Sequence, residues 1–236
     1  MRFYYPEINK AHAELTGEAH THAAYALRIR TGDTITVFDG KGTDYACKVV
    51  DIKKDKTFLE IIDVASNVGE AKTAVTLYLS VIKQDRFEMA VQKATELGIN
   101  RIVPVYTTFT QRNIILNYDR LNKIAVAACE QCGRSVIPVI EQAIDFGELV
   151  ERAKKTHMIF LWERELHGSM QSAIDKTASD VAVFVGPEGG ITEPEKTELT
   201  AAGAQAVTLG KRILRAETAA IAALSVVYYE MGEWVL

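Results

Sequence analysis

Short apolar stretches separated by polar turns fill the first seventy residues of the chain. Four stretches rich in β-branched and aromatic side chains predict strands: residues 25–30, 33–39, 45–52 and 58–63. Turn-like runs such as DGKG lie between them, and their glycines permit the positive φ that tight turns require. Several short strands at close spacing predict a small β-barrel or sandwich.

After a polar linker at residues 66–72 the pattern changes to apolar strands that alternate with helices. The predicted strands are 76–82, 101–107, 158–163, 181–186 and 206–210, and the predicted helices are 86–97, 118–132, 145–155, 169–177, 193–202 and 216–231. Strands that are apolar throughout and alternate with helices are typical of a parallel sheet covered on both faces. We therefore expect a β-rich domain over residues 1–70 and an α/β domain over residues 71–236.

Capping residues mark the ends of two of these helices. Asp85 and Glu88 predict a capping box, and Gly98 predicts the end of the same helix. Thr192 is the predicted N-cap of the helix at 193–202, with Pro194 in its first turn.

Composition narrows the class of protein. The 236 residues are 48% hydrophobic and 25% charged, as in an ordinary globular protein of one or two domains. No stretch approaches the roughly 20 apolar residues that span a bilayer, and the N-terminus lacks the apolar run of a signal peptide. The three cysteines make no disulfide framework, so we expect a cytoplasmic protein.

The net charge of −4 argues mildly against a nucleic-acid partner. Binding to RNA would therefore have to depend on local groups of Lys and Arg.

Candidate chemistry follows the last two predicted strands, because ligands of open parallel sheets bind at the carboxyl ends of strands. The loop VGPEGGIT at 185–192 has glycines that let a ligand approach the main chain, and LGKRILRAET at 209–218 brings several cations together. A simple tight turn remains an alternative for the first loop, and a solvated basic loop remains one for the second. The motif G-x-G-x-x-G and the phosphate-loop Lys-Ser/Thr pair are absent, which disfavours phosphate binding.

Cys129 and Cys132 have the spacing of a metal-binding pair but lack a second pair of ligands. Both fall on the apolar face of the helix predicted at 118–132, so core packing is the better interpretation. We expect no metal site.

Several motifs together resemble the bacterial 16S ribosomal RNA uracil-N3 methyltransferase family, a branch of the SPOUT methyltransferases. The matching residues are QKATELG at 92–98, Glu130-Gln131 with Gly133-Arg134, VGPEGG at 185–190 and LGKRILRAETA at 209–219. Near the N-terminus His22, Ala26-Leu27-Arg28 and Gly32-Asp33 resemble the family pattern more weakly. The resemblance covers nearly the whole chain.

This resemblance implies a PUA-like β-barrel for residues 1–70 and a SPOUT α/β domain with a C-terminal trefoil knot for residues 71–236. It also implies the cofactor S-adenosyl-L-methionine, the substrate 16S ribosomal RNA of the small subunit, and a homodimer. Periodicity alone would predict an unknotted, doubly wound sheet, since knots are rare.

Carried onto this chain, the family's cofactor loops place S-adenosylmethionine against Leu161, Gly186, Gly190, Leu209, Ile213 and Leu214. Uridine N3 is a weakly acidic imide, so methylation requires that its proton be removed or that the resulting anion be stabilised. Glu217 and Glu188 are the candidate bases, and Arg215 is the candidate for stabilising the anion. A negative charge near a helix N-terminus is an equally good explanation of Glu217.

The residues expected to contact RNA are Arg2, His22, Arg28 and Arg30 in the first domain and Arg86, Arg134 and Arg212 in the second. Arg suits phosphate groups and also stacks on bases. Each could instead be a solvated surface charge. Packing is an alternative for His22, and Arg134 follows a helix C-terminus, where a cation is favoured in any protein.

Three other classes of function remain open. A ribosome-assembly factor would bind RNA with a decayed cofactor site, and a related methyltransferase would act on transfer RNA or another position. A small-molecule nucleotide enzyme is disfavoured by the missing phosphate-binding motif.

Overall fold

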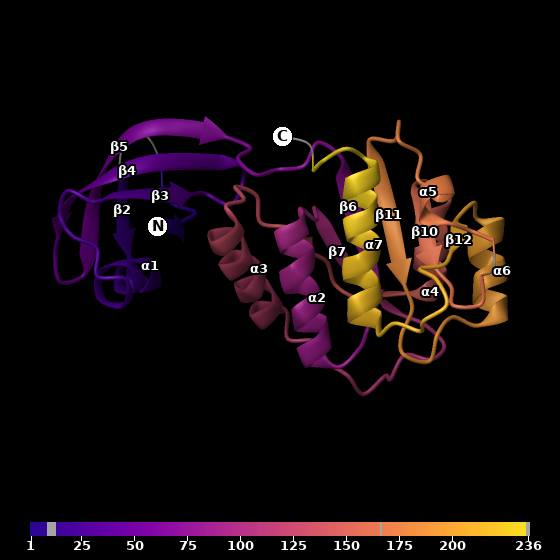
Figure 1. Ribbon diagram of the computed structural model, residues 1–236. Coiled ribbons are helices and arrows are strands. Elements are labelled where there is room, and N and C mark those ends of the chain that lie inside the picture. Colours follow the sequence, from indigo (N-terminus) through magenta and orange to yellow (C-terminus); the bar gives the residue numbers. More distant parts are fainter. Residues whose placement is uncertain (9–12, 166, 235–236) are drawn as a thin grey trace. The chain divides into compact units, whose positions relative to one another are not determined.

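The computed structural model describes residues 1–8, 13–165 and 167–234 (Figure 1). The chain divides into two compact units, which we describe separately. The first unit contains residues 1–70 and 126–137, and the second contains residues 71–125 and 138–236.

The first unit is built on a five-stranded sheet with the order β1-β3-β4-β5-β2. The strands are β1 (Arg2–Tyr4), β2 (Ala13–Thr16), β3 (Thr34–Phe38), β4 (Thr43–Ile52) and β5 (Lys56–Ser66). β1 runs parallel to β3 and the other neighbours are antiparallel. Alternate side chains such as Ile35, Val37, Cys47 and Val49 point into one buried core. The predicted strands at 33–39, 45–52 and 58–63 are confirmed as β3, β4 and β5.

The strand predicted at 25–30 is wrong. The chain there forms the short helix α1 (Gly17–Thr21), the π-helical turn η1 (His22–Ala26) and an irregular segment. β1 occupies the free edge of β3 and β2 occupies the free edge of β5, so neither edge is left to pair with this segment. The alternating sequence LRIR instead buries Ile29 and leaves Leu27 41% exposed.

The second unit contains a parallel sheet with the order β12-β10-β11-β6-β7-β8, and β9 also pairs with β7. The strands are β6 (Ala74–Ser80), β7 (Arg101–Tyr106), β8 (Val139–Ile140), β9 (Ile144–Asp145), β10 (His157–Leu161), β11 (Asp180–Val185) and β12 (Gln205–Val207). Its helices are α2 (Gln84–Leu97), α4 (Phe146–Ala153), α5 (Met170–Ala173), α6 (Glu193–Ala201) and α7 (Ala216–Glu230). A further helix, α3 (Tyr118–Cys132), begins in the second unit and ends in the first. The predicted fold class is confirmed: a small β-rich unit and an α/β unit with a parallel sheet.

Helices cover both faces of this sheet (Figure 1). α4 and α6 pack over Phe160 and Phe184, while α2 and α7 cover the other face. β12 lies at the edge of the sheet, yet α7, which follows it, packs on the central strands β11 and β6. The chain therefore turns back from the edge to the middle of the sheet, and the C-terminal knot implied by the family resemblance requires such a path.

One of the two predicted helix starts is wrong. α2 begins at Gln84 with Lys83 as N-cap, so Asp85 already lies inside the first turn and cannot cap it. Gly98 ends this helix in the left-handed conformation, with φ of 113°, as predicted. Thr192 and Glu195 form a capping box at the start of α6, with Pro at N1 or N2. None of the helices in the described ranges is both long and apolar enough to cross a membrane.

Candidate active site

The loops that follow β10, β11 and β12 converge on one cavity of the second unit. β10 pairs in parallel with both β11 and β12, so the carboxyl ends of the three strands meet at the same edge of the sheet. The cavity is lined by residues 161–163, 185–191 and 207–214 and by Ala216 and Ala219.

The structure brings together most of the predicted site residues. The six expected cofactor contacts, Leu161, Gly186, Gly190, Leu209, Ile213 and Leu214, all line the cavity. Glu188 and Arg212 also line it. Arg215 and Glu217 do not line it, although Ala216 between them does. Arg215 is exposed, whereas Glu217 is only 6% exposed and its Oε2 has no hydrogen-bond partner within the described chain.

Two glycines shape the turn after β11. A Cβ atom on Gly186 would lie 2.8 Å from Cγ1 of Ile191. Gly190 has φ of +78°, and a Cβ there would lie 2.7 Å from Oε1 of Glu163. The backbone therefore turns more tightly than other residues allow, which leaves main-chain groups at the cavity wall.

The loop after β10 is bound to the loop after β12. The amide of Trp162 donates to the carbonyl of Val207 at 3.0 Å, and the amide of Thr208 donates to the carbonyl of Gly168 at 3.0 Å. A Cβ on Gly168 would lie only 2.1 Å from the carbonyl oxygen of Ala206. The two loops therefore form a continuous wall of the cavity, and this close approach depends on Gly168.

A buried carboxylate holds the end of the glycine-rich turn. Glu195 accepts hydrogen bonds from the amide and hydroxyl of Thr192, both at 2.9 Å, and from the amide of Thr108 at 2.8 Å. Burial favours the neutral acid, but these donors outweigh it and hold the pKa of Glu195 below its usual value. The start of α6 and the turn after β7 are thus joined through one anion.

Two residues expected to contact RNA lie in ionic networks of the first unit, Arg134 fully buried and Arg2 partly buried. Arg134 is 2% exposed and its Nη2 lies 2.7 Å from Oε2 of Glu70. Arg2 donates to Asp44 at 2.7 Å and to the carbonyl of Arg134 at 2.6 Å. Because both guanidinium groups pair within the unit, they are poorly placed to contact RNA.

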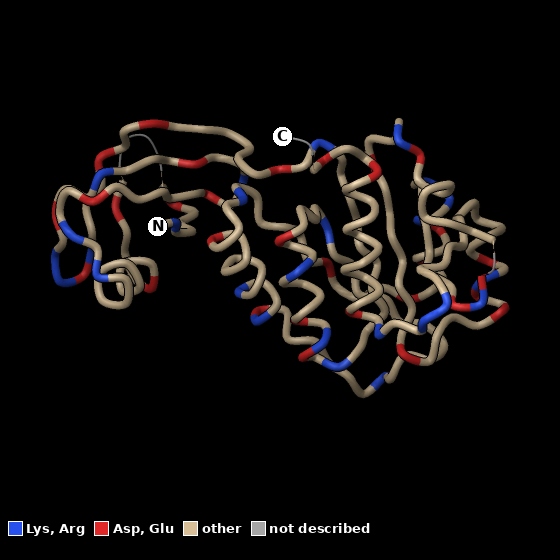
Figure 2. Tube along the Cα trace, viewed as in Figure 1, with Lys and Arg blue, Asp and Glu red and all other residues tan. Residues whose placement is uncertain are grey.

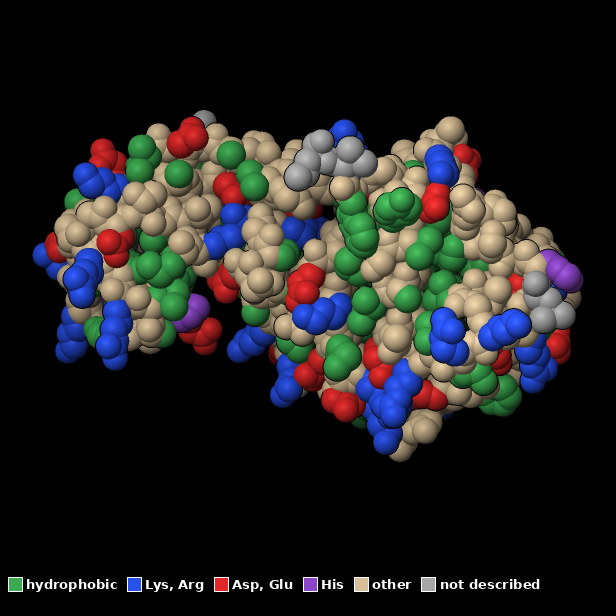
Figure 3. Space-filling view, viewed as in Figure 1, with side chains coloured by type: hydrophobic (Ala, Val, Ile, Leu, Met, Phe, Trp, Pro, Cys, Tyr) green, Lys and Arg blue, Asp and Glu red, His purple; other side chains and the backbone are tan. Residues whose placement is uncertain are grey.

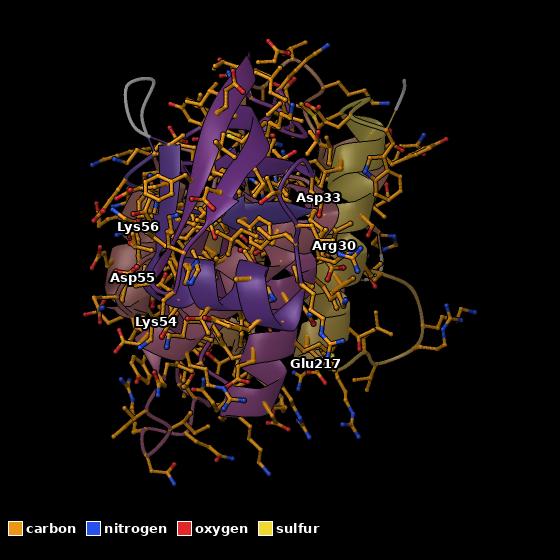
Figure 4. All side chains as sticks on the ribbon, turned by 90° about the vertical axis from the view of Figure 1, so that its left-hand side faces the viewer. Arg30, Asp33, Lys54, Asp55, Lys56 and Glu217 are labelled. Atoms are coloured by element: carbon orange, nitrogen blue, oxygen red, sulfur yellow. The ribbon has the colours of Figure 1, made fainter. Side chains whose placement is uncertain are left out.

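The other candidate RNA contacts lie on surfaces. His22, Arg28 and Arg30 are exposed on the first unit. Figure 4 shows Arg30 close to Asp33, whose carboxylate accepts from the Arg30 amide at 2.7 Å. Arg212 is exposed on the cavity loop, and Arg86 pairs with Glu188 at 2.7 Å. Basic and acidic positions are intermingled along both units (Figure 2), in agreement with the low net charge.

Cys47 and Cys129 have the environment of core residues, whereas Cys132 is only partly buried. Burial raises the pKa of Cys129 to about 12 and that of Cys47 to about 11. Among the residues that the structure describes, no group of three or more His, Cys, Asp or Glu side chains is arranged to hold a metal ion.

Trp162 and Glu163 also line the cavity and were not among the predicted site residues. Their signal was their place directly after a buried strand, at the carboxyl end of the sheet. The indole Nε1 of Trp162 is buried and has no hydrogen-bond partner in the described chain, while Nζ of Lys196 lies 5.1 Å from the centre of its ring.

Comparisons with known proteins agree on one family. Residues 69–228 match the RNA methyltransferase domain and residues 15–62 match the RNA methyltransferase PUA domain. Ribosomal RNA small subunit methyltransferase E of Rickettsia conorii is 33% identical over 90% of this chain and 87% of that protein. The protein of the same name from Bacillus subtilis is 29% identical over 98% of this chain and 97% of that protein.

A solved structure agrees with these sequence matches. The crystal structure of a ribosomal RNA small subunit methyltransferase E from Neisseria gonorrhoeae, bound to S-adenosyl methionine, superposes with a TM-score of 0.85. It is 31% identical and the match covers 99% of both chains. The likeness therefore includes both units and the cavity loops.

Proposed function

The chain belongs to the RNA methyltransferase family, and from that premise we propose that it transfers a methyl group from S-adenosyl-L-methionine to N3 of a uridine in 16S ribosomal RNA of the small subunit. The observation that carries this proposal is the convergence of the loops after β10, β11 and β12 on one cavity. The relative from Neisseria gonorrhoeae, which matches this chain from end to end, binds S-adenosylmethionine.

The residues of the cavity fit this cofactor. Leu161, Leu209 and Ile213 give apolar walls for a neutral adenine ring, and the glycine-rich turn offers main-chain hydrogen bonds. Glu163 supplies negative charge for a sulfonium or an ammonium group, while Lys211 and Arg212 supply positive charge for a carboxylate. Both signs of charge are needed, because the amino-acid part of the cofactor is a zwitterion.

The chain's own residues would handle the proton and the charge of the uracil. When bound, S-adenosylmethionine would supply an electrophilic methyl group, whose bond to sulfur breaks and leaves a neutral thioether. Glu188 or Glu217 would accept the proton of N3, so that the nitrogen lone pair becomes available for the new N–CH₃ bond. Arg215 would stabilise the negative charge that spreads onto the uracil oxygens.

We assign the holding of RNA to residues 1–70 and the methyl transfer to residues 71–236. The PUA and methyltransferase matches, at 15–62 and 69–228, support this division. His22, Arg28 and Arg30 would contact RNA from the first domain, and Arg86 and Arg212 from the second. An enzyme with this substrate would act in the cytoplasm.

A homodimer is also part of the proposal. α7 carries few charges, and hydrophobic side chains lie along it at the surface (Figure 3). Tyr229 is 67% exposed and Trp234 is 54% exposed at its C-terminal end. An apolar surface of this kind is typical of a protein contact. Light scattering should give a mass near twice 26.1 kDa, and a monomeric mass would contradict this part.

The function is tested with labelled S-adenosylmethionine and small ribosomal subunits that lack the modification. Nucleoside analysis should identify 3-methyluridine in 16S RNA, and label in another nucleoside or in transfer RNA would contradict the proposal. Calorimetric titration with S-adenosylmethionine provides a second readout. A ribosome-assembly factor with a decayed cofactor site would give no saturable heat.

A further inference from the structure

The turn after β7 displays an aromatic ring beside the cavity. Thr107 and Thr110 are buried, and the amide of Thr107 donates to Oγ1 of Thr110 at 2.9 Å. The amide of Thr110 in turn donates to the carbonyl of Thr107 at 3.2 Å. Phe109 lies in the middle of this closed turn and is 52% exposed. Two hydrogen bonds close the turn, yet about half of Phe109 faces solvent.

Phe109 is seated directly on the glycine-rich turn. A Cβ atom on Gly189 would lie 2.8 Å from Cβ and 3.1 Å from Cγ of Phe109, so only glycine allows this approach. Gly189 itself lines the cavity. Glu195, which accepts from the amide of Thr108, joins the same turn to the start of α6. The ring is therefore held in a defined position at the edge of the cavity.

An ion pair adjoins Gly189, the glycine that contacts the ring. Glu188 precedes Gly189, lines the cavity and pairs with Arg86 at 2.7 Å. The Arg86 side chain is 25% exposed and that of Glu188 is 41% exposed, so both can still meet a ligand. A carboxylate accepts from an N–H group and a guanidinium donates to a carbonyl oxygen. The imide edge of uracil presents one N–H between two carbonyl groups, which is the complementary pattern.

We propose that Phe109 is the platform on which the target uracil stacks, with Glu188 and Arg86 facing its imide edge. The inference rests on the proposed function, because it identifies where the methyl acceptor of that reaction lies. Enzymes that modify a base take it out of its stack, and proteins hold such bases against aromatic side chains. Cytosine has no proton on N3, so its lone pair would face the carboxylate of Glu188 and be repelled.

Substitutions at Phe109 separate stacking from packing. Phe109→Tyr keeps the flat ring, whereas Phe109→Leu keeps an apolar side chain against Gly189 but has no π face. Stacking on an aromatic side chain corresponds to roughly ten- to hundredfold in affinity. We expect Phe109→Leu to lower kcat/KM for unmodified small-subunit RNA by at least roughly tenfold, and Phe109→Tyr to stay close to the wild type. Ile115→Ala is the matched control, because Ile115 is 86% exposed on the same connection.

The affinity for S-adenosylmethionine and the thermal unfolding temperature are measured on every variant. Both should remain unchanged in Phe109→Leu. A Leu variant as active as the wild type, or a Tyr variant as impaired as Leu, would overturn the inference. Loss of cofactor binding in Phe109→Leu would also overturn it, since the ring would then support the turn. A wild-type protein that methylates no RNA would instead remove the proposed function, independently of these comparisons.

Discussion

At the scale of single residues, exposure separates the two candidate bases. A group that removes the proton from N3 must come within hydrogen-bond distance of the substrate. The Glu188 side chain is 41% exposed and lines the cavity, whereas Glu217 is 6% exposed and does not. Glu217 lies in the first turn of α7, where a negative charge is favoured without any catalytic role. The geometry therefore favours Glu188.

Replacing each glutamate with glutamine tests this assignment. Glu188→Gln should lower kcat by about 10²–10⁴-fold, the usual contribution of a general base, with the affinity for S-adenosylmethionine retained. Glu217→Gln should keep the methylation rate and lose about 1 kcal/mol of stability or less. Single-turnover rates and urea unfolding provide the two measurements. The reverse pattern would identify Glu217 as the base.

Thiol reactivity should follow burial. The thiolate is the reactive form of cysteine, and burial raises the pKa of Cys47 to about 11 and that of Cys129 to about 12. Both thiols should remain unmodified by a disulfide reagent at pH 8 in the folded protein and react once it is unfolded in urea. Mass spectrometry of the digested protein locates each label. Rapid labelling of Cys129 in the native state would show that this part of α3 opens easily.

At the scale of elements, the sequence predicted those parts of the fold whose stability comes from local patterns. The helix predicted at 118–132 coincides with α3, because one apolar face repeats through it. The N-cap Thr192 could be predicted because Glu195, its partner in the capping box, is a near neighbour in sequence. The strand predicted at 25–30 is wrong because β1 and β2 already pair with the edges of β3 and β5. That pairing depends on other parts of the chain and leaves no signal within residues 25–30.

Prediction of the site was limited in the same way, because local features could be predicted and contacts between distant residues could not. The loops at strand ends could be predicted from the order of the elements, and the family resemblance then identified Gly186 and Gly190 within the glycine-rich loop. The burial of Arg134 could not be predicted, since its partner Glu70 is distant in sequence. The contact between Phe109 and Gly189 could not be predicted either, because it depends on how two loops pack against each other.

The buried carboxylate of Glu195 should make the stability of the second unit depend on pH. Its pKa is lower in the folded than in the unfolded chain, so the anion stabilises the fold above its ordinary pKa of 4.5. This contribution is lost as the pH falls through the folded-state value. Glu195→Gln should lower the free energy of unfolding by about 1–3 kcal/mol at pH 7, and the difference from the wild type should shrink below pH 4.5.

Glu198→Gln is the control for this series, because Glu198 is exposed on the same helix. Urea unfolding at several pH values gives the curves for all three proteins. A constant difference between Glu195→Gln and the wild type down to pH 3 would show that the hydrogen bonds do not depend on the charge.

At the scale of the whole molecule, the two units are interleaved along the chain. Residues 126–137 return to the first unit after residues 71–125 have built part of the second. Their attachment is ionic: Glu70 accepts from Arg134 and from the amides of Ser135 and Val136, and Asp44 accepts from the hydroxyl of Ser135 at 2.7 Å. The first unit therefore depends on a segment distant in sequence.

Glu70→Gln should weaken the first unit selectively. Removing one partner of a buried pair leaves the other charge uncompensated, at a cost of about 3–5 kcal/mol. Hydrogen exchange should show faster opening of β4 and of residues 134–136, while β6 and β11 keep their protection. Glu60→Gln, at an exposed position of β5, should have no such effect. Equal loss of protection in both units would show that they unfold together.

The return of residues 126–137 has a consequence for how the protein is made. A ribosome synthesises roughly 5–20 residues per second and domains generally fold in the order in which they emerge. The N-terminal sheet is synthesised first, but Glu70 and Asp44 can pair with Arg134 and Ser135 only after these later residues have emerged. During that interval the carboxylates of Glu70 and Asp44 remain hydrated, and chaperones can still bind the incomplete sheet.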